Sequence, residues 1–389
     1  MPYLDYAASA PLRPEALAAM RPFLERPVAN PSSQHGPGRA ARSAVETARE
    51  HVAALAGADP GQVVFTSGGT EADNLAVKGT VLAREVGARH LVASAVEHHA
   101  VLDAAEWASQ DAGATVELAP VDERGRVRLD PLGELLQPGR TALVAVMAAN
   151  NEVGTLQPVA EAAELAHAAG AALLCDAVQA AGAPGVDIAA DGIDLLALAA
   201  HKLGGPTGIG ALVVRAGQRL RPLLHGGGQE RGLRSGTLPV AAIVGFGAAA
   251  AAALAGRGRD TAHLVRLRDR LLAGLRALEP GLEVNGDPGF GLPGLLSVRF
   301  PGRRSEDLLL LLDRAGVACS AGSACASGAV TPSHVLLATG RTPAQARETV
   351  RLSLGHASTQ ADVDAAIDAV RHALQVLAPG QPAATGAVP

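Results

Sequence analysis

The stretch "ALVAVMAANNEVGTLQPVAEAAELAHAAGAALLCDA", residues 142–177, contains the pattern that decides the fold. Its two apolar runs, 142–149 and 172–177, are short and almost uninterrupted, which is typical of strands buried on both faces. The segment between them at 159–170, "VAEAAELAHAAG", has the alanine content and length of a helix. A buried strand, a helix and another buried strand predict two parallel strands joined by a crossover.

The same alternation continues on both sides of this stretch. Further strand-like runs occur at 62–67, 90–95, 195–200 and 210–215, and "TEADNLAVKGTVLARE" at 70–85 has a helical pattern. Strands that alternate with helices predict an α/β fold in which helices cover both faces of a mostly parallel sheet.

The pattern changes after residue 257. Residues 238–257 resemble a long connecting helix, and "HLVRLRDRLLAGLRAL" at 263–278 follows as a charged amphipathic helix. A strand at 295–300, a helix at 306–316, a strand at 349–355 and a last helix from about 360 to 377 then form a second α/β unit. We therefore predict a large domain at 15–257, a small domain made of 1–14 and 258–378, and a disordered tail at 379–389.

The composition excludes several classes of protein. Hydrophobic residues make up 48% and charged residues 18% of the 389 residues, which indicates a globular chain. The net charge of −5 argues against binding to nucleic acid or to a membrane surface. The N-terminal sequence has no apolar signal core, and the three cysteines have no paired spacing, so we expect a reducing cytoplasm. No spacing of histidine or cysteine predicts a metal site.

Lysine is scarce in this chain. Only Lys78 and Lys202 are lysines among 33 basic residues, and Lys202 follows the apolar run 195–200. A lysine at the end of a buried strand is desolvated, which lowers its pKa and makes the amine a usable nucleophile. The alternative is a surface lysine in a turn, which the scarcity and the apolar approach disfavour.

Other polar residues also follow predicted strands. The Gly69–Thr70 turn between a strand and a helix can bind an anion, although Thr70 can equally be a helix cap. Asp176 can pair with a protonated ring nitrogen, with Gln179 in reach of the same ligand, or it can cap the next helix. His98 can stack on a flat ring or lie on the surface.

Two more candidates complete the set. Asn151 offers an amide after the strand at 142–149, and Arg351 can clamp a carboxylate from a strand of the second domain. An anion turn, an acid for a ring nitrogen, a nucleophilic lysine and a stacking imidazole are the groups that bind pyridoxal 5′-phosphate. We therefore predict pyridoxal phosphate as the cofactor.

The sequence also resembles a known family. The segments "YLDYAASAP", "TSGGTEADNLAVKG", "EHHAVL", "NNEVGT", "DAVQ", "HKLGGPTGIGAL", "HGGGQERGLRSGT", "GSACASG" and "RLSLG" occur in order over nearly the whole chain. They are similar to those of cysteine desulfurases of the class V aminotransferase family, in the branch of the iron–sulfur-cluster desulfurases. The resemblance implies fold type I of the pyridoxal phosphate enzymes, a homodimer, and conversion of L-cysteine to L-alanine.

The resemblance also implies roles for single residues. Lys202 matches the lysine that binds the cofactor covalently, and His98 the stacking histidine, which is also a candidate acid/base. The other cofactor contacts that it implies are Asp176 at the ring nitrogen, Gln179 and Asn151 near the phenolic oxygen, Gly69, Thr70 and His201 at the phosphate, and Thr237 at the phosphate of the other subunit. Arg351, with Asn151 beside it, matches the clamp for the substrate carboxylate.

One position departs from the family pattern. Many relatives carry a phosphate-binding serine three residues before the lysine, whereas this chain has Ala199. The loss of one hydroxyl contact weakens phosphate binding by about 1 kcal/mol.

The small-residue stretch "CSAGSACASG" at 319–328 is the last distinctive motif. Cys325 matches the nucleophile that accepts the substrate sulfur as a persulfide and passes it to an acceptor protein. Glycine and other small residues allow a loop to move with little steric cost, so we predict a mobile loop at about 319–332. Cys319 and Cys175 are expected to be structural. The alternatives are another class V enzyme, such as a lyase or aminotransferase, and a degenerate non-catalytic scaffold.

Overall fold

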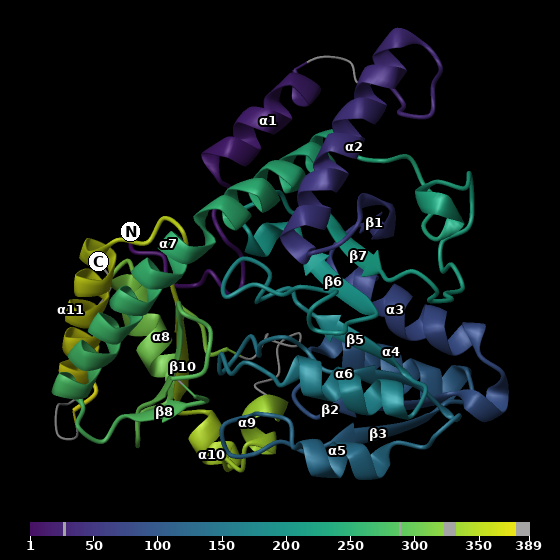
Figure 1. Ribbon diagram of the computed structural model, residues 1–389. Coiled ribbons are helices and arrows are strands. Elements are labelled where there is room, and N and C mark those ends of the chain that lie inside the picture. Colours follow the sequence, from purple (N-terminus) through teal and green to yellow (C-terminus); the bar gives the residue numbers. More distant parts are fainter. Residues whose placement is uncertain (26–28, 288, 323–331, 379–389) are drawn as a thin grey trace, which may run out of the picture.

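A computed structural model describes residues 1–25, 29–287, 289–322 and 332–378. It contains a seven-stranded and a three-stranded sheet with helices around both (Figure 1). The strands of the larger sheet are β1 (Val63–Thr66), β2 (His90–Ser94), β3 (Thr115–Ala119), β4 (Thr141–Ala145), β5 (Ala172–Asp176), β6 (Leu195–Ala199) and β7 (Gly210–Val214).

The larger sheet has the order β1-β7-β6-β5-β4-β2-β3. Neighbours from β6 to β3 are parallel, and β7 is antiparallel to both β1 and β6. The predicted α/β fold with a mostly parallel sheet is confirmed. The prediction missed β3, which has no continuous apolar run because it lies at the edge of the sheet and is half exposed.

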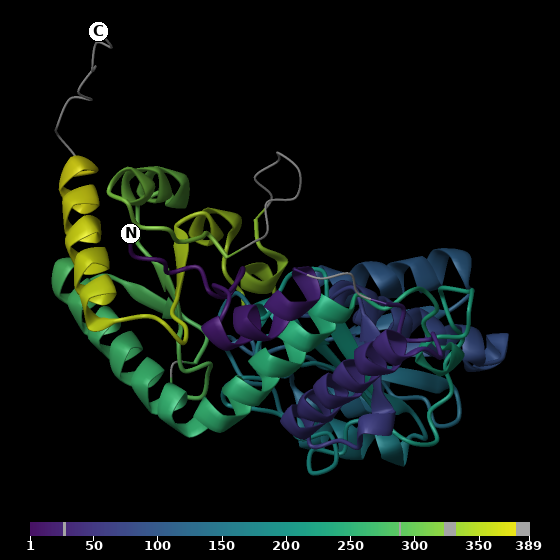
Figure 2. The same cartoon turned by 90° about the horizontal axis from the view of Figure 1, so that it is seen from above.

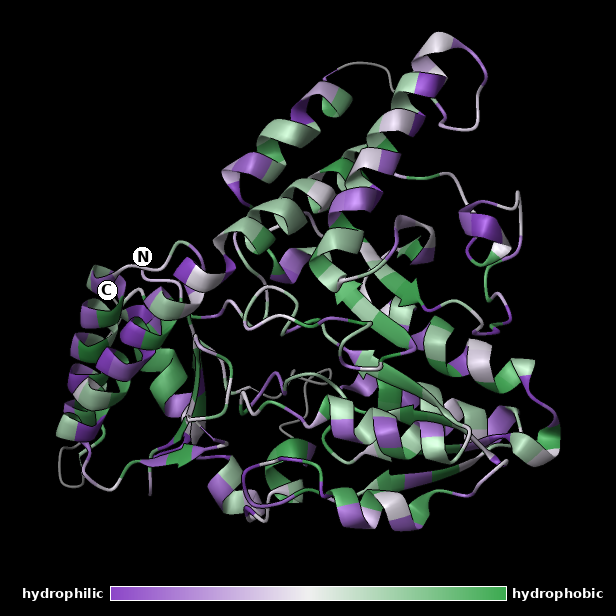
Figure 3. Cartoon of the chain, viewed as in Figure 1, coloured by the Kyte–Doolittle hydropathy of each residue, from purple (hydrophilic) through white to green (hydrophobic). Residues whose placement is uncertain are grey.

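Helices cover both faces of this sheet. The helices of the larger unit are α1 (Pro14–Leu24), α2 (Gly36–Ala56), α3 (Gly69–Ala83), α4 (His99–Asp111), α5 (Leu129–Leu135) and α6 (Val159–Ala168). One hydrophobic core joins the sheet to α2, α6 and the first part of α7 (Val240–Leu278), and another joins the opposite face to α3 and α4. Hydrophobic residues accordingly fill the strands of the larger sheet in Figure 3.

The smaller sheet is antiparallel, in the order β10-β9-β8. It consists of β8 (Glu283–Asn285), β9 (Leu295–Arg299) and β10 (Thr349–Ser353), and its helices are α8 (Ser305–Arg314), α9 (His334–Ala338), α10 (Pro343–Ala346) and α11 (Gln360–Val376). A separate core joins this sheet to α8, α11 and the second part of α7.

The helix α7 differs from the sequence expectation. The segments expected as two helices form one helix of 39 residues, which runs from the larger sheet to the smaller one (Figures 1 and 2). The predicted boundary between residues 257 and 258 falls inside α7, and the division into domains stays a prediction. By length and composition α7 could cross a membrane, but half of its most apolar window is buried in the protein.

Candidate active site

A cavity lies where the loops that follow several parallel strands meet. Its lining residues are Gly69, Thr70, Asp73, His98, Met147, Asn151, Asp176, Val178, Gln179, Ala199, His201 and Lys202. All predicted cofactor contacts except Thr237 are among them. The segments that follow β1, β2, β4, β5 and β6 each contribute, because parallel strands bring their carboxyl ends to one edge of the sheet.

The first turn of α3 forms one end of the cavity. A Cβ atom at Gly69 would lie 2.8 Å from Cγ2 of Val178, so only glycine lets the backbone approach here. Ala199 also lines the cavity and presents a methyl group instead of a hydroxyl. The exposed N–H groups of a helix start suit a phosphate.

Asp176 lies at the end of β5 and is buried. Its carboxylate accepts a hydrogen bond from the N–H of Val178 at 2.9 Å. Burial raises the pKa of Asp176, while that hydrogen bond and the charges of His98 and Lys202 act to lower it. A protonated ring nitrogen would supply the opposite charge that favours the ionised carboxylate.

Two further buried acids were missed by the sequence analysis. Asp73 lines the cavity with 1% of its surface exposed, and Glu97 is completely buried. Within the described residues, Oδ1 of Asp73 and Oε2 of Glu97 have no hydrogen-bond partner. Burial, more than repulsion by Asp176, raises the pKa of Glu97 to about 8. Asp73 could have been found from its position, because it is an acidic residue one helical turn after Gly69 on the buried face of α3.

Lys202 follows β6 in a short 3₁₀ turn. Its Nζ donates hydrogen bonds to the carbonyls of Ala7 at 2.5 Å and of Ala8 at 2.8 Å. Burial, followed by repulsion from Arg351, lowers the pKa of Lys202 to about 8. The predicted loss of basicity therefore has a structural cause, and a neutral amine is accessible near physiological pH.

The two histidines of the cavity favour the neutral imidazole. His98 caps α4, and its Nδ1 accepts a hydrogen bond from the N–H of Ala100 at 3.1 Å. Desolvation by the cavity walls lowers the pKa of His98. Burial and the charge of Lys202 lower the pKa of His201 to about 4.

Arg351 lies on β10 of the smaller sheet and is 4% exposed. Its Nη1 donates to the carbonyl of Asn151 at 2.8 Å, and its Nη2 donates to Asp5 at 2.9 Å. Arg351 thus connects the smaller sheet to the loop after β4, beside the cavity.

The remaining predicted residues lie elsewhere. Thr237 is exposed and does not line the cavity of its own chain. Cys325 and most of the predicted mobile loop lie outside the described residues. Cys175 is buried in β5, and burial raises the pKa of Cys319 to about 12. A thiol that stays protonated is a poor nucleophile, which agrees with structural roles for Cys175 and Cys319.

The mostly parallel sheet has a cavity at its strand ends, and Lys202 lines this cavity. This arrangement agrees with the protein family that the sequence matches. A family model described as Aminotransferase class-V matches residues 2–366, and the chain belongs to this family. It is 47% identical over 373 residues to the "IscS-like cysteine desulfurase" of Mycobacterium tuberculosis, with 95% of both chains covered.

Solved structures give the same result. The chain matches a "NIFS-LIKE PROTEIN" with a TM-score of 0.90 at 35% identity, covering 96% of this chain and 99% of that one. It also matches "SspA in complex with cysteine" with a TM-score of 0.78 at 33% identity, covering 91% of this chain and 99% of that one.

Proposed function

We propose that the protein is a pyridoxal phosphate-dependent cysteine desulfurase, which converts L-cysteine to L-alanine and transfers the sulfur to an enzyme cysteine and then to an acceptor. The observation that carries this proposal is that Lys202 and Asp176 both line one cavity in a chain of the class-V family. The names of its relatives favour this reaction over a lyase, an aminotransferase or a scaffold.

The cavity residues fit pyridoxal phosphate. The glycine cradle at the start of α3 suits the phosphate, Asp176 the ring nitrogen, and Lys202 the aldehyde carbon. The cofactor, when bound, withdraws electrons from the substrate Cα.

The chain's own residues hold the substrate and move its protons. The guanidinium of Arg351 binds the carboxylate of L-cysteine, with Asn151 beside it. The neutral amine of Lys202 accepts the Cα proton, because a base with a pKa of about 8 exchanges protons readily near neutral pH. The neutral ring of His98, which lines the cavity, would stack on the bound cofactor.

Sulfur transfer is assigned to Cys325. Its thiolate attacks the sulfur of the substrate, and a sulfur–sulfur bond forms as the Cβ–S bond breaks. The electron pair of the broken bond stays with carbon, which takes up a proton to become the methyl group of alanine. The persulfide on Cys325 then passes its outer sulfur to a thiolate of the acceptor.

Replacing Cys325 with Ser tests this assignment. We expect sulfide release from L-cysteine under reductant to fall to background, while the visible cofactor absorption stays intact, because Cys325 does not hold the cofactor. Lys202→Ala serves as the contrasting variant and should lose that absorption. Normal sulfide release by the serine variant would contradict the role of Cys325.

The wider setting follows from the same proposal. We propose a cytoplasmic homodimer in which Thr237 of one subunit reaches the phosphate bound by the other, and an acceptor protein that takes the sulfur. The proposal leaves four uses of the sulfur open, namely iron–sulfur cluster assembly, tRNA thiolation, DNA phosphorothioation and a biosynthetic sulfur carrier. Mass spectrometry of persulfide transfer to purified candidate acceptors would identify the partner.

A further inference from the structure

The N-terminal segment, residues 3–10, lies between the smaller sheet and the turn that carries Lys202. Tyr3 pairs with Ala318 and Asp5 pairs with Ser353 as isolated parallel bridges. At its other end, the N–H of Ala10 donates to the carbonyl of His201 at 2.9 Å. The segment is therefore attached to both sides of the active site.

The backbone of this segment contacts two cavity residues directly. The carbonyl of Ala7 accepts hydrogen bonds from Nζ of Lys202 at 2.5 Å and from Nε2 of Gln179 at 2.8 Å. The N–H of Ala7 donates to Oγ of Ser353 at 2.9 Å. The Ala7 peptide is thus held by β10, and it holds the cofactor lysine in turn.

Asp5 contacts the other cation of the site. Its Oδ1 lies 2.9 Å from Nη2 of Arg351, and the two side chains are 22% and 5% exposed. Within the described residues, Nε of Arg351 has no hydrogen-bond partner. A guanidinium buried to this extent needs an opposite charge, which Asp5 supplies. The carboxylate of Asp5 and the carbonyl of Asn151 together fix its orientation.

We propose that Asp5 is a positioning residue, which holds the guanidinium of Arg351 ready to bind the substrate carboxylate and balances its charge beside Lys202. The proposal rests on the proposed function in one respect, namely that the substrate is an α-amino acid. The charged and titratable groups near Lys202 are Arg351, Asp176, Asp5, His98 and His201. Asp5 and Asp176 raise the pKa of Lys202, whereas burial and Arg351 lower it.

The first test is the steady-state kinetics of Asp5→Asn. This variant keeps the shape and an acceptor oxygen but removes the charge that holds Arg351. We expect the KM for L-cysteine to rise about tenfold with kcat changed less than about twofold, because one charge-assisted hydrogen bond to the clamp is weakened.

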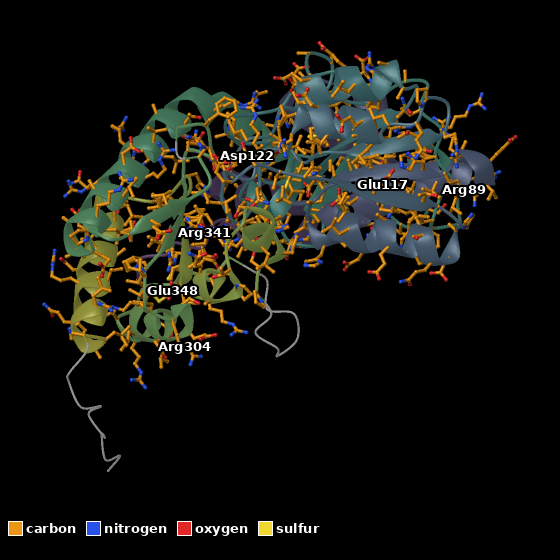
Figure 4. The ribbon with its side chains drawn as sticks, turned by 90° about the horizontal axis from the view of Figure 1, so that it is seen from below. Arg89, Glu117, Asp122, Arg304, Arg341 and Glu348 are labelled. Atoms are coloured by element: carbon orange, nitrogen blue, oxygen red, sulfur yellow. The ribbon has the colours of Figure 1, made fainter. Side chains whose placement is uncertain are left out.

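Glu348→Gln is the matched control. Glu348 accepts a hydrogen bond from Nε of Arg299 at 2.7 Å, and it directly precedes β10 of the smaller sheet (Figure 4). These two side chains are 19% and 14% exposed, so this ion pair resembles the Asp5 pair in burial. The control should leave KM unchanged. An unchanged KM in Asp5→Asn, or a fall in kcat alone, would overturn the positioning role.

The second test does not depend on desulfurase activity. Protein stripped of cofactor is mixed with pyridoxal phosphate at a series of pH values, and the growth of the visible band is followed. Only the neutral amine of Lys202 reacts, so the rate should rise with pH through about 8 in the wild type. Loss of the Asp5 charge should move the midpoint to lower pH, and the Glu348 control should not.

The two tests separate the two proposals. A wild-type protein that captures the cofactor but releases neither sulfide nor alanine from L-cysteine would contradict the desulfurase function. In that case the shifted midpoint of Asp5→Asn would still support the role of Asp5 beside Lys202. An unmoved midpoint would overturn that role.

Discussion

Within the described residues, the side chain of Glu97 makes one hydrogen bond. Its Oε1 accepts from the N–H of Met147 at 2.7 Å, and its side chain has no exposed surface. The buried neighbours Asp73 and Asp176 repel a negative charge at this place. The carboxyl of Glu97 therefore keeps its proton to a pH several units above that of a free glutamate.

This burial predicts a pH-dependent stability of the chain without cofactor. Because the folded-state pKa of Glu97 is raised to about 8, its contribution to stability is complete below about pH 4 and is lost as the pH rises through 8. Each pH unit inside that window costs at most about 1.4 kcal/mol for this proton. Glu97→Gln mimics the neutral acid, so its stability should fall less between pH 5 and pH 8.

Urea unfolding at pH 5, 6.5 and 8 measures this difference. Asp73 and Asp176 are present in both proteins and act with the same sign, so the difference between the two profiles measures the titration of Glu97 together with its repulsion by these two acids. Glu106→Gln, at an exposed position on α4, should follow the wild type. Parallel pH profiles of wild type and Glu97→Gln would show that Glu97 is not held as a neutral acid.

At the scale of single residues, the sequence predicted which side chains carry the chemistry, but it did not predict which side chains they contact. Lys202 and Asp176 were recognised because a polar residue directly after an apolar run must lie at a strand end. Asp5 could not be assigned, because its partner Arg351 is 346 residues away along the chain. A contact of this kind depends on how the N-terminus pairs with β10, for which the local sequence has no signal.

The helix α7 contributes both to one core of the larger sheet and to the core of the smaller sheet. Its first part packs against α2, and a Cβ atom at Gly247 would lie 2.6 Å from Cα of Ala48. Its second part belongs to the core of the smaller sheet. The change from an alanine-rich to a charged amphipathic pattern suggested two helices, but it marks the point where one helix changes its packing partner.

Two glycines of α7 give a matched pair of variants. Gly247→Ala should lower the free energy of unfolding by about 1–3 kcal/mol, because the new methyl overlaps the backbone of α2. Gly258→Ala has nothing within 4 Å of the new Cβ and should raise it by up to about 1 kcal/mol, since alanine favours helix. Urea unfolding checks both. Equal effects would contradict the close contact of α7 with α2.

At the scale of the whole molecule, the segment that carries Thr237 is fixed, but Thr237 does not line the cavity of its own chain. Glu230 accepts hydrogen bonds from Arg49 at 2.8 and 2.9 Å, and Arg234 donates to Glu71 on the first turn of α3 at 2.8 Å. These ion pairs hold the segment, and Thr237 is exposed at its end. Such an arrangement suits a residue that completes the site of a second subunit.

Mixed dimers would test this arrangement. In the proposed dimer, Thr237→Glu would place a negative charge beside the phosphate, so it should abolish cofactor binding and activity, as Lys202→Ala should. If Thr237 acts on the other subunit, a dimer of one Thr237→Glu and one Lys202→Ala chain has one intact site. We expect unfolding and refolding the two variants together to restore about a quarter of wild-type activity, with one intact site in half of the dimers. No recovery in verified mixed dimers would contradict the shared site.

The sequence by itself determined the α/β class and most of the cavity. Apolar runs of strand length fix which residues end buried strands, and parallel strands bring those ends together whatever the details of packing. This is why Lys202, Asp176 and His98 could be placed before the structure was known.

Only the tertiary structure decided which charges act on those residues. The pairing of Asp5 with Arg351, the carbonyls that hold Lys202, and the burial of Asp73 and Glu97 arise between segments far apart in the chain. Electrostatic effects depend on distance and on burial, and neither can be read from sequence order.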